Sequence, residues 1–126
     1  LKQYEPEIRN TVDVLSDSDW DAIHTGLRMV VENTKEFDGF PIEAAGKTGT
    51  AQEDLKRPNH ALFVGYAPYD NPEISIATRI ANGYTSHNAA EVSKKILAYY
   101  FKVEDADSLL NGQAENINAT SNGVND

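Results

Sequence analysis

The stretch Gly46–Gln52, Gly-Lys-Thr-Gly-Thr-Ala-Gln, most constrains the fold of this chain, because its small residues fit a strand. Lys47 supplies a positive charge, and Thr48 and Thr50 supply hydroxyl donors. Gly49 has no Cβ, so the backbone of a ligand can approach closely there. An edge strand also points backbone N–H groups at whatever lies beside it. These groups suit a site that recognises a peptide ending in a carboxylate and stabilises an oxyanion.

The same residues also resemble the end of a phosphate-binding P-loop, G-x-x-x-x-G-K-[ST]. That motif needs a glycine five residues before Gly46, where the chain has Pro41, and the nearest upstream glycine is Gly39. No apolar strand leads into the segment. The pattern therefore disfavours a P-loop, whereas a chance Lys-Thr-Gly in a surface strand stays open on these residues alone.

Two further strands are expected downstream of residues 44–52. Residues 60–67 form an apolar run, and residues 73–81 alternate isoleucine with Ser75, Ala77 and Arg79, so one side should be buried against a helix. Short loops separate the three segments, and such loops favour an antiparallel meander.

Helical patterns lie on both sides of these strands. The first predicts a core-facing helix of about four turns, capped by Ser16 or Ser18. Its apolar positions are Trp20, Ile23, Leu27, Val30 and Val31. The second helix can start at Asn88 with Glu91. The residues that share one of its faces are Ala89, Val92, Ile96 and Tyr100. We expect it to pack on the isoleucine side of the third strand, giving an α+β fold in which helices flank an antiparallel three-stranded meander.

The run 59–68, Asn-His-Ala-Leu-Phe-Val-Gly-Tyr-Ala-Pro, follows Gly46–Gln52 after a short polar loop. Together with the upstream helix, this order resembles the C-terminal part of the transpeptidase domain of class B penicillin-binding proteins, which are monofunctional and of high molecular weight. In that family A-G-K-T-G-T-A-Q precedes H-A-W-F-x-G-[FY]-A-P. The resemblance covers about residues 11–101. Leu62 departs from it, because the family commonly has an aromatic residue there.

The resemblance implies a serine β-lactamase-like fold and roles for the matching residues. Lys47 would hold the serine of an S-x-N element and make the site electropositive. Thr48 and Thr50 would bind the substrate carboxylate, and the N–H of Thr50 would be one oxyanion donor beside Gly49. The implied ligands are peptidoglycan stem peptides ending in D-Ala-D-Ala and β-lactam antibiotics, with no cofactor and no metal.

The nucleophile of that family is missing from the chain. No serine is followed three residues later by lysine, so there is no S-x-x-K and no activated serine. Ser86-His87-Asn88 matches S-x-N, but it follows the Lys-Thr-Gly strand, whereas the family has the reverse order, so we interpret it as a helix cap.

A complete transpeptidase domain is about twice as long as this chain or more, so we interpret the chain as a fragment. It is expected to be inactive alone and to need the missing N-terminal part of the domain. The parent is expected at the extracytoplasmic face of the bacterial cell membrane, anchored by an N-terminal transmembrane helix that the chain lacks. Residues 1–102 are then the segment of the transpeptidase domain.

The remaining residues, 103–126, form an acidic, Asn-rich tail with few large apolar groups, which predicts disorder. The net charge of −9 argues against a nucleic-acid partner. There is no cysteine, and His24, His60 and His87 lie in no metal-ligand spacing. Asp17-Ser18-Asp19-Trp20-Asp21 begins like a calcium loop, but it fits the acidic start of a helix better.

The leading hypothesis is a segment of a D,D-transpeptidase that cross-links cell-wall stem peptides by serine acyl transfer and binds penicillin. One alternative is a β-lactam-sensing or degenerate penicillin-binding module without turnover. Another is a serine β-lactamase. Ala51-Gln52 and the strand end 65–68, Gly-Tyr-Ala-Pro, favour the transpeptidase over the β-lactamase.

Overall fold

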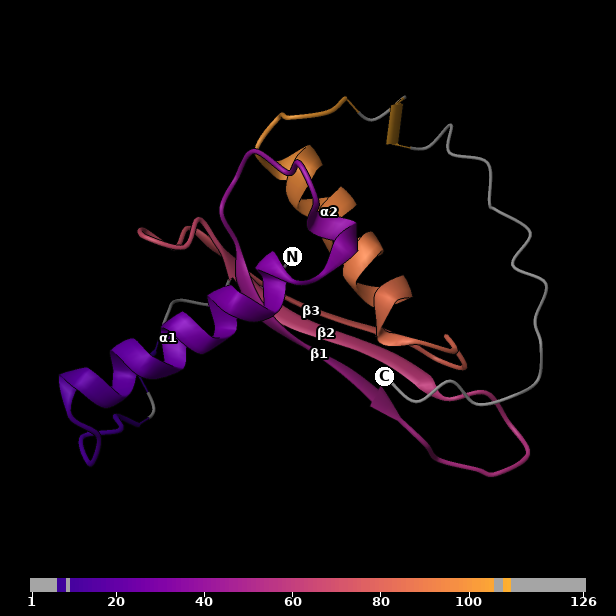
Figure 1. Ribbon diagram of the computed structural model, residues 1–126, viewed down its shortest axis with the longest axis horizontal. Helices are drawn as coiled ribbons and strands as arrows, with labels where there is room; N and C mark the ends of the chain where they lie inside the picture. The colour runs from indigo at the N-terminus through magenta and orange to yellow at the C-terminus, as the bar shows by residue number, and fades with distance from the viewer. Residues whose placement is uncertain (1–6, 9, 106–107, 110–126) are drawn as a thin grey trace.

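The computed structural model describes residues 7–8, 10–105 and 108–109 of the 126-residue chain. Figure 1 shows its elements in the order helix, short 3-10 helix, three strands, helix. They are α1 (Asp17–Glu32), η1 (Lys35–Phe37), β1 (Ala45–Ala51), β2 (His60–Ala67), β3 (Ile74–Ile80) and α2 (Ser86–Tyr100). Most of the tail predicted to be disordered, residues 103–126, lies outside the described residues.

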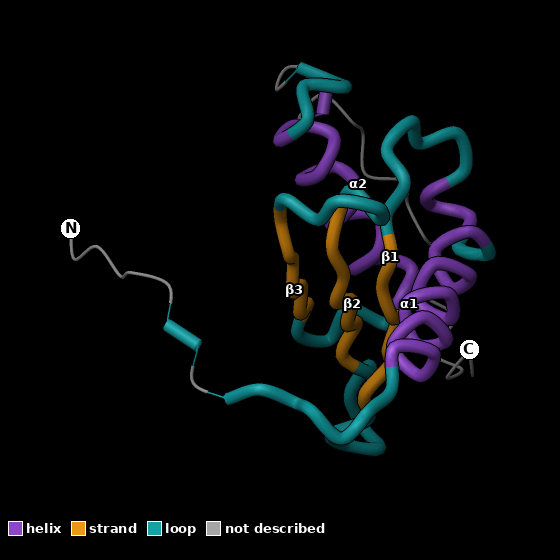
Figure 2. The backbone as a smooth tube through the Cα atoms, turned by 90° about the vertical axis from the view of Figure 1, so that its left-hand side faces the viewer, coloured by secondary structure: helices purple, strands orange, loops and turns teal. Residues whose placement is uncertain are grey.

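The three strands form one antiparallel sheet in the order β1-β2-β3, as Figure 2 shows from the side. The predicted meander is therefore confirmed, with each strand within about one residue of its predicted bounds. Within the described residues, β1 and β3 each pair with β2 only, so both are edge strands.

Helix α2 covers one face of this sheet. Thr48, Phe63 and Thr78 lie opposite one another in the register, so they share a face. Phe63 is 1% exposed, and the Thr78 hydroxyl lies 2.8 Å from the hydroxyl of Ser93 on α2. The isoleucines of β3 pack against the same core. The expectation that the closing helix covers the isoleucine side is confirmed.

The face of α2 that is buried differs from the face that the sequence pattern predicted. Val92, Ile96 and Tyr100 are 40%, 46% and 47% exposed. The helix instead buries Ser86, Ala89, Ala90, Ser93, Leu97 and Ala98. Only Ala89 belongs to both sets. Small side chains on this face let the helix approach the sheet closely, and the Ser93–Thr78 hydrogen bond forms at that contact.

Helix α1 begins at a capping box. The Ser16 hydroxyl accepts from the Asp19 N–H, and the Asp19 carboxylate accepts from the Ser16 N–H at 2.9 Å. The Ser16 hydroxyl also donates to the Asp19 carboxylate at 2.6 Å, and this bond, together with the one from the Ser16 N–H, lowers the pKa of Asp19 below its ordinary value. Of the two predicted cap residues, Ser16 is therefore the correct one. Ser18 lies inside the helix.

Helix α1 lies beside β1 and contacts it (Figure 2). The Arg28 guanidinium donates to the carbonyl of Ala44 at 3.3 Å, and the His24 and Tyr66 rings lie 5.9 Å apart. Val31 is buried, but Ile23 is 43% exposed, so not every apolar position of this helix faces the core. Neither α1 nor any other helix in the described part of the chain is long and apolar enough to cross a membrane.

Candidate functional site

All four residues of the predicted site lie on the edge strand β1. Side chains alternate along a strand, so Lys47 and Gly49 lie on one face of the sheet and Thr48 and Thr50 on the other. Lys47 lies opposite the exposed Val64, on the face that α2 does not cover. The structure therefore places the charge and the two hydroxyls on opposite faces of one edge.

Lys47 is exposed, and its Nζ donates to the carbonyl oxygen of Thr48 at 2.8 Å. The ammonium group therefore lies along its own strand. The described residues show no ion pair for it within 4.0 Å. The charge of this ammonium group is therefore available to an anionic ligand.

Thr50 is half-buried under the start of α2. Its hydroxyl accepts a hydrogen bond from the backbone N–H of Ser86 at 3.2 Å. Thr50 and Ser86 are far apart in the sequence, and no spacing rule connects them. The end of β1 and the beginning of α2 thus meet at this hydroxyl.

The two glycines of the motif differ in what surrounds them. A Cβ on Gly46 would lie 2.5 Å from the carbonyl oxygen of Val64 and 2.7 Å from the Phe63 ring, closer than real Cβ atoms come. A Cβ on Gly49 would meet only Leu62, at 3.5 Å, an ordinary contact. Packing within the chain therefore requires a glycine at 46 and does not require one at 49, which leaves ligand approach as a reason for Gly49.

The S-x-N-like run lies at the start of α2, but it does not supply the cap. Thr85 is the N-cap, and its side chain accepts from the N–H of His87. Ser86 is the first helical residue, and the Asn88 amide donates to the carbonyl of Gly83 at 2.7 Å. The predicted helix start at Asn88 is therefore two residues late, because the cap belongs to Thr85.

His60 connects the loop after β1 with the turn after β3, at the end of the sheet where Thr50 lies. Its side chain is buried, its Nε2 contacts the Glu53 carboxylate, and its Nδ1 accepts from the Asn82 N–H at 3.0 Å. An Nδ1 that accepts leaves the proton on Nε2, which donates to Glu53. This agrees with the structural role expected for His60. His24 packs on aromatic rings and His87 contacts Glu36, so both also have structural partners.

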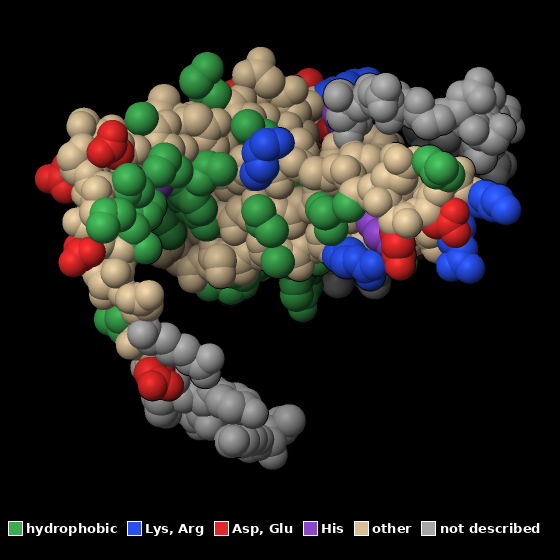
Figure 3. Space-filling view, turned by 90° about the horizontal axis from the view of Figure 1, so that it is seen from below, with side chains coloured by type: hydrophobic (Ala, Val, Ile, Leu, Met, Phe, Trp, Pro, Cys, Tyr) green, Lys and Arg blue, Asp and Glu red, His purple; other side chains and the backbone are tan. Residues whose placement is uncertain are grey.

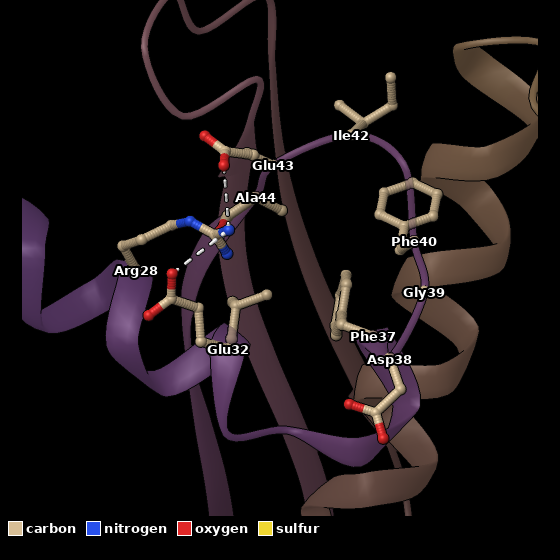
Figure 4. Close-up of a pocket in the computed structure, with 10 residues that line it drawn as sticks. Arg28, Glu32, Phe37, Asp38, Gly39, Phe40, Ile42, Glu43 and Ala44 are labelled. Carbon is tan, nitrogen blue, oxygen red and sulfur yellow. Dashed lines mark hydrogen bonds and ion pairs between the residues drawn. The ribbon is translucent and has the colours of Figure 1, made fainter.

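A cavity of about 250 Å³ lies at the opposite end of β1, next to Ala44 (Figure 4). It is lined by Phe37, Phe40 and Ile42 and by the Arg28 guanidinium. That group forms ion pairs of 3.4 Å with both Glu32 and Glu43 (Figure 4). Two carboxylates neutralise the arginine, so this cavity offers an anion little attraction. Ala44 and Thr50 are roughly 20 Å apart along an extended strand, which separates the cavity from the predicted site.

Tyr66 lies near that cavity end, opposite Ala45 in the sheet. Burial raises the pKa of its hydroxyl, and the neighbouring Tyr69 adds to the effect. Among the described residues its hydroxyl oxygen has no hydrogen-bond partner. A raised pKa keeps Tyr66 neutral, so it adds no charge to the strand.

Figure 3 shows the molecule from below, with hydrophobic side chains gathered mostly on the left beside several acidic ones and most of the basic side chains farther right. Exposed hydrophobic residues in the described chain include Val64 on the sheet and Ile23 and Met29 on α1.

Residues 3–98 match the family model of the penicillin-binding protein transpeptidase domain. This match covers most of the chain and includes β1 with all four predicted site residues. The chain belongs to this family. The predicted resemblance to class B penicillin-binding proteins is confirmed, and the chain corresponds to part of their transpeptidase domain.

Named relatives support the assignment. The peptidoglycan D,D-transpeptidase MrdA of Acinetobacter baumannii is 36% identical over 101 residues, which cover 68% of this chain and 15% of that protein. The Haemophilus influenzae protein of the same name is 31% identical over 121 residues, covering 79% of this chain and 19% of its own length. The chain thus spans less than a fifth of the curated relatives it matches.

A solved structure gives the same picture for the fold. The structure of Pseudomonas aeruginosa PBP2 in complex with WCK 5153 is 31% identical and superposes with a TM-score of 0.67. The match covers 78% of this chain and 23% of that one. The predicted fold class, part of a penicillin-binding transpeptidase fold, is therefore confirmed.

The sequence pattern located the strand that carries Lys47–Thr50 but did not identify the residues that contact its Thr50 end. Ser86, His60 and Asn82 reach the Thr50 end of β1 through hydrogen bonds between segments that are distant in the sequence. No local pattern marks such contacts. The only signal was the unusual polar run 82–88 between β3 and α2.

Proposed function

We propose that this chain is the substrate-binding segment of a peptidoglycan D,D-transpeptidase that cross-links stem peptides by serine acyl transfer. The observation that carries the proposal is the edge strand β1. It combines an exposed ammonium group, two hydroxyls and a glycine that the chain's own packing does not require. Residues 1–102 form this segment in the proposal, and residues 103–126 form a separate tail.

Each site residue has a role in the proposed reaction. Lys47 attracts the substrate carboxylate and positions a serine supplied by another part of the domain. The hydroxyls of Thr48 and Thr50 bind the carboxylate as charge-assisted hydrogen-bond donors. The N–H of Thr50 donates to the oxyanion that forms when the serine oxygen attacks the carbonyl carbon. Loss of one such donor typically costs about 3 to 4 kcal/mol of transition-state stabilisation.

The unpaired edge of β1 suits an extended ligand. A stem peptide ending in D-Ala-D-Ala, or a β-lactam, would lie along the strand and form backbone hydrogen bonds in the manner of strand addition. Gly49 is where the ligand backbone would come closest, because a Cβ there meets only Leu62 at a normal distance.

The nucleophile belongs to the rest of the domain in this proposal, since the sequence has no S-x-x-K. Two surfaces offer a place for that part. The outer edge of β3 is unpaired within the described sheet. The stripe of α2 that faces away from the sheet exposes Val92, Ile96, Tyr99 and Tyr100. Burial of such residues is worth about 25 cal/mol per Å² of apolar surface, so they favour a covering partner.

The proposed place of action is the extracytoplasmic face of the bacterial cell membrane, where peptidoglycan is assembled, with the parent held by an N-terminal transmembrane helix. The chain's lack of cysteine is compatible with this location.

Labelled penicillin tests the proposal. The full-length protein that contains this segment should form a stable covalent adduct, and hydrolysis of that adduct should be slow. The 126-residue chain alone should remain unlabelled, because it carries no activated serine. The full-length protein should also cross-link stem peptides in a mass-spectrometric assay.

Three results would contradict the proposal, each in a different way. Labelling of the isolated chain would show that it holds its own nucleophile. Rapid hydrolysis of the adduct would identify a β-lactamase. Reversible binding of penicillin without an adduct would identify a sensing module without turnover.

A further inference from the structure

The Thr50 hydroxyl accepts a hydrogen bond from the first N–H of helix α2. The first N–H groups of a helix have no carbonyl partner within the helix. The N-cap Thr85 satisfies the N–H of His87, and Thr50 satisfies the N–H of Ser86 at 3.2 Å. A residue of the proposed site is therefore bonded to the positive end of a 15-residue helix.

The turn before α2 fixes this contact. Asn82 and Tyr84 have positive φ angles of 53° and 67°, which non-glycine residues seldom adopt. Two hydrogen bonds hold the turn: His60 Nδ1 accepts from the Asn82 N–H, and the Asn59 carbonyl accepts from the Tyr84 N–H, both at 3.0 Å. A Cβ on Gly83 would lie 2.8 Å from Ala61, so the turn also packs tightly on the sheet.

The first turn of α2 carries no negative charge of its own, and the carboxylates nearest to it, Glu36 and Glu53, contact the rings of His87 and His60. The nearby Glu36 carboxylate is engaged by the His87 ring at 2.9 Å. A helix N-terminus carries a partial positive charge equivalent to about half an elementary charge. This field favours an anion at the Thr50 end of β1.

A hydroxyl accepts through a lone pair and donates through its hydrogen, so it can do both at once when a carboxylate is bound. The N–H that it accepts polarises the O–H bond and strengthens the donated hydrogen bond. We infer that Ser86, through its backbone N–H, is a positioning residue. It orients and polarises the Thr50 hydroxyl for recognition of the substrate carboxylate. The inference rests on the proposed function and adds to it a role for the start of α2.

The test is a pair of variants in the full-length protein, Ser86→Pro and Ser86→Ala. Both lack the serine hydroxyl, and only proline lacks the N–H. Proline suits the first position of a helix, and the extended backbone of Thr85 (φ −132°, ψ 149°) is what a residue before proline adopts. The proline ring occupies the place of the hydrogen, so the Thr50 hydroxyl loses this hydrogen bond.

The measurement is the acylation rate constant for benzylpenicillin and for its methyl ester, which has no carboxylate charge. The ratio of the two constants reports carboxylate recognition and is insensitive to a general loss of active protein. We expect the ratio to be roughly three- to tenfold lower in Ser86→Pro than in Ser86→Ala, the effect of one net hydrogen bond. In a Thr50→Val background the two variants should give equal ratios, because their shared acceptor is gone.

A second variant removes the N–H without adding a ring. Incorporation of the α-hydroxy analogue of alanine at position 86 replaces the amide by an ester. If circular dichroism shows that proline unfolds α2, this ester variant replaces Ser86→Pro in the comparison with Ser86→Ala. Equal ratios for Ser86→Ala and the ester variant, with Thr50→Val still lowering the ratio, would overturn the inference and leave the proposed function intact. Absence of penicillin labelling in the unaltered protein would overturn both.

Discussion

Two regions of the molecule meet on strand β1 and differ in what determines their residues. The packing region, Gly46, Phe63, Gly65 and Leu97, is set by contacts inside the chain. The ligand end, Lys47–Thr50, is not. A Cβ at Gly46 or Gly65 would lie 2.5 Å from a backbone oxygen, whereas a Cβ at Gly49 meets only Leu62 at 3.5 Å.

The difference shows how one short strand serves two purposes. Where the Phe63 ring and helix α2 press on the sheet, only small residues fit. Toward the proposed ligand end, the strand is exposed or half-buried and bears polar groups, of which the Thr50 hydroxyl also accepts from the Ser86 N–H. Packing does not require the residues at this end of β1, so the ligand proposed for the strand explains them best.

The largest expected effect lies in the packing region, at Leu97→Ala. Leu97 is fully buried, and its loss should lower the free energy of unfolding by about 2 to 5 kcal/mol through lost burial and the cavity left behind. The matched control Ile96→Ala should cost less than about 1 kcal/mol, because Ile96 is 46% exposed. Urea denaturation measures both, and equal losses would refute the assigned α2 stripe.

At the ligand end, Lys47→Ala should slow penicillin acylation of the full-length protein by about a hundredfold or more, because it removes the charge that faces the carboxylate. The control Lys56→Ala removes an exposed lysine from the loop after β1 and should change the rate little. Unfolding of both variants should match the unaltered protein. A rate unaffected by Lys47→Ala would remove Lys47 from the site.

The two glycines provide the sharpest test of the comparison. Gly46→Ala should destabilise the chain by about 1 to 3 kcal/mol, because a backbone oxygen cannot move aside cheaply. Gly49→Ala should change the free energy of unfolding by less than about 0.5 kcal/mol and yet reduce penicillin acylation. The comparison fails if thermal unfolding shows Gly49→Ala to be the more damaging of the two.

The smallest effect is expected away from both regions, at the start of α1. Ser16→Ala should cost about 1 kcal/mol at neutral pH by breaking the capping box. Hydrogen bonds from Ser16 lower the pKa of Asp19 in the folded state. That stabilisation is therefore present above the ordinary pKa of 3.8 and is lost as the pH falls through the lower folded value. The difference between Ser16→Ala and the unaltered protein should shrink in acid, and a constant difference would contradict this role for Asp19.

Local patterns predicted much of the fold because they report interactions between near neighbours. Strand alternation located β3, and a serine with an acid three residues later predicted a helix cap at Ser16 or Ser18, of which the structure has Ser16. The cap of α2 was misplaced, because Thr85 and the residues before Asn88 look like a loop in sequence. The buried stripe of α2 was also missed, since small and polar Ala90 and Ser93 face the core while larger Val92 and Ile96 do not.

The sequence by itself determined the family, the meander and the strand that carries Lys47, Thr48, Gly49 and Thr50, because each rests on short-range order of residue types. Only the tertiary structure decided which glycine the core requires and what holds the Thr50 hydroxyl. The first depends on the Phe63 ring lying over Gly46, and the second depends on the Ser86 N–H reaching the Thr50 hydroxyl. Both contacts form only when segments that are distant in the sequence pack together.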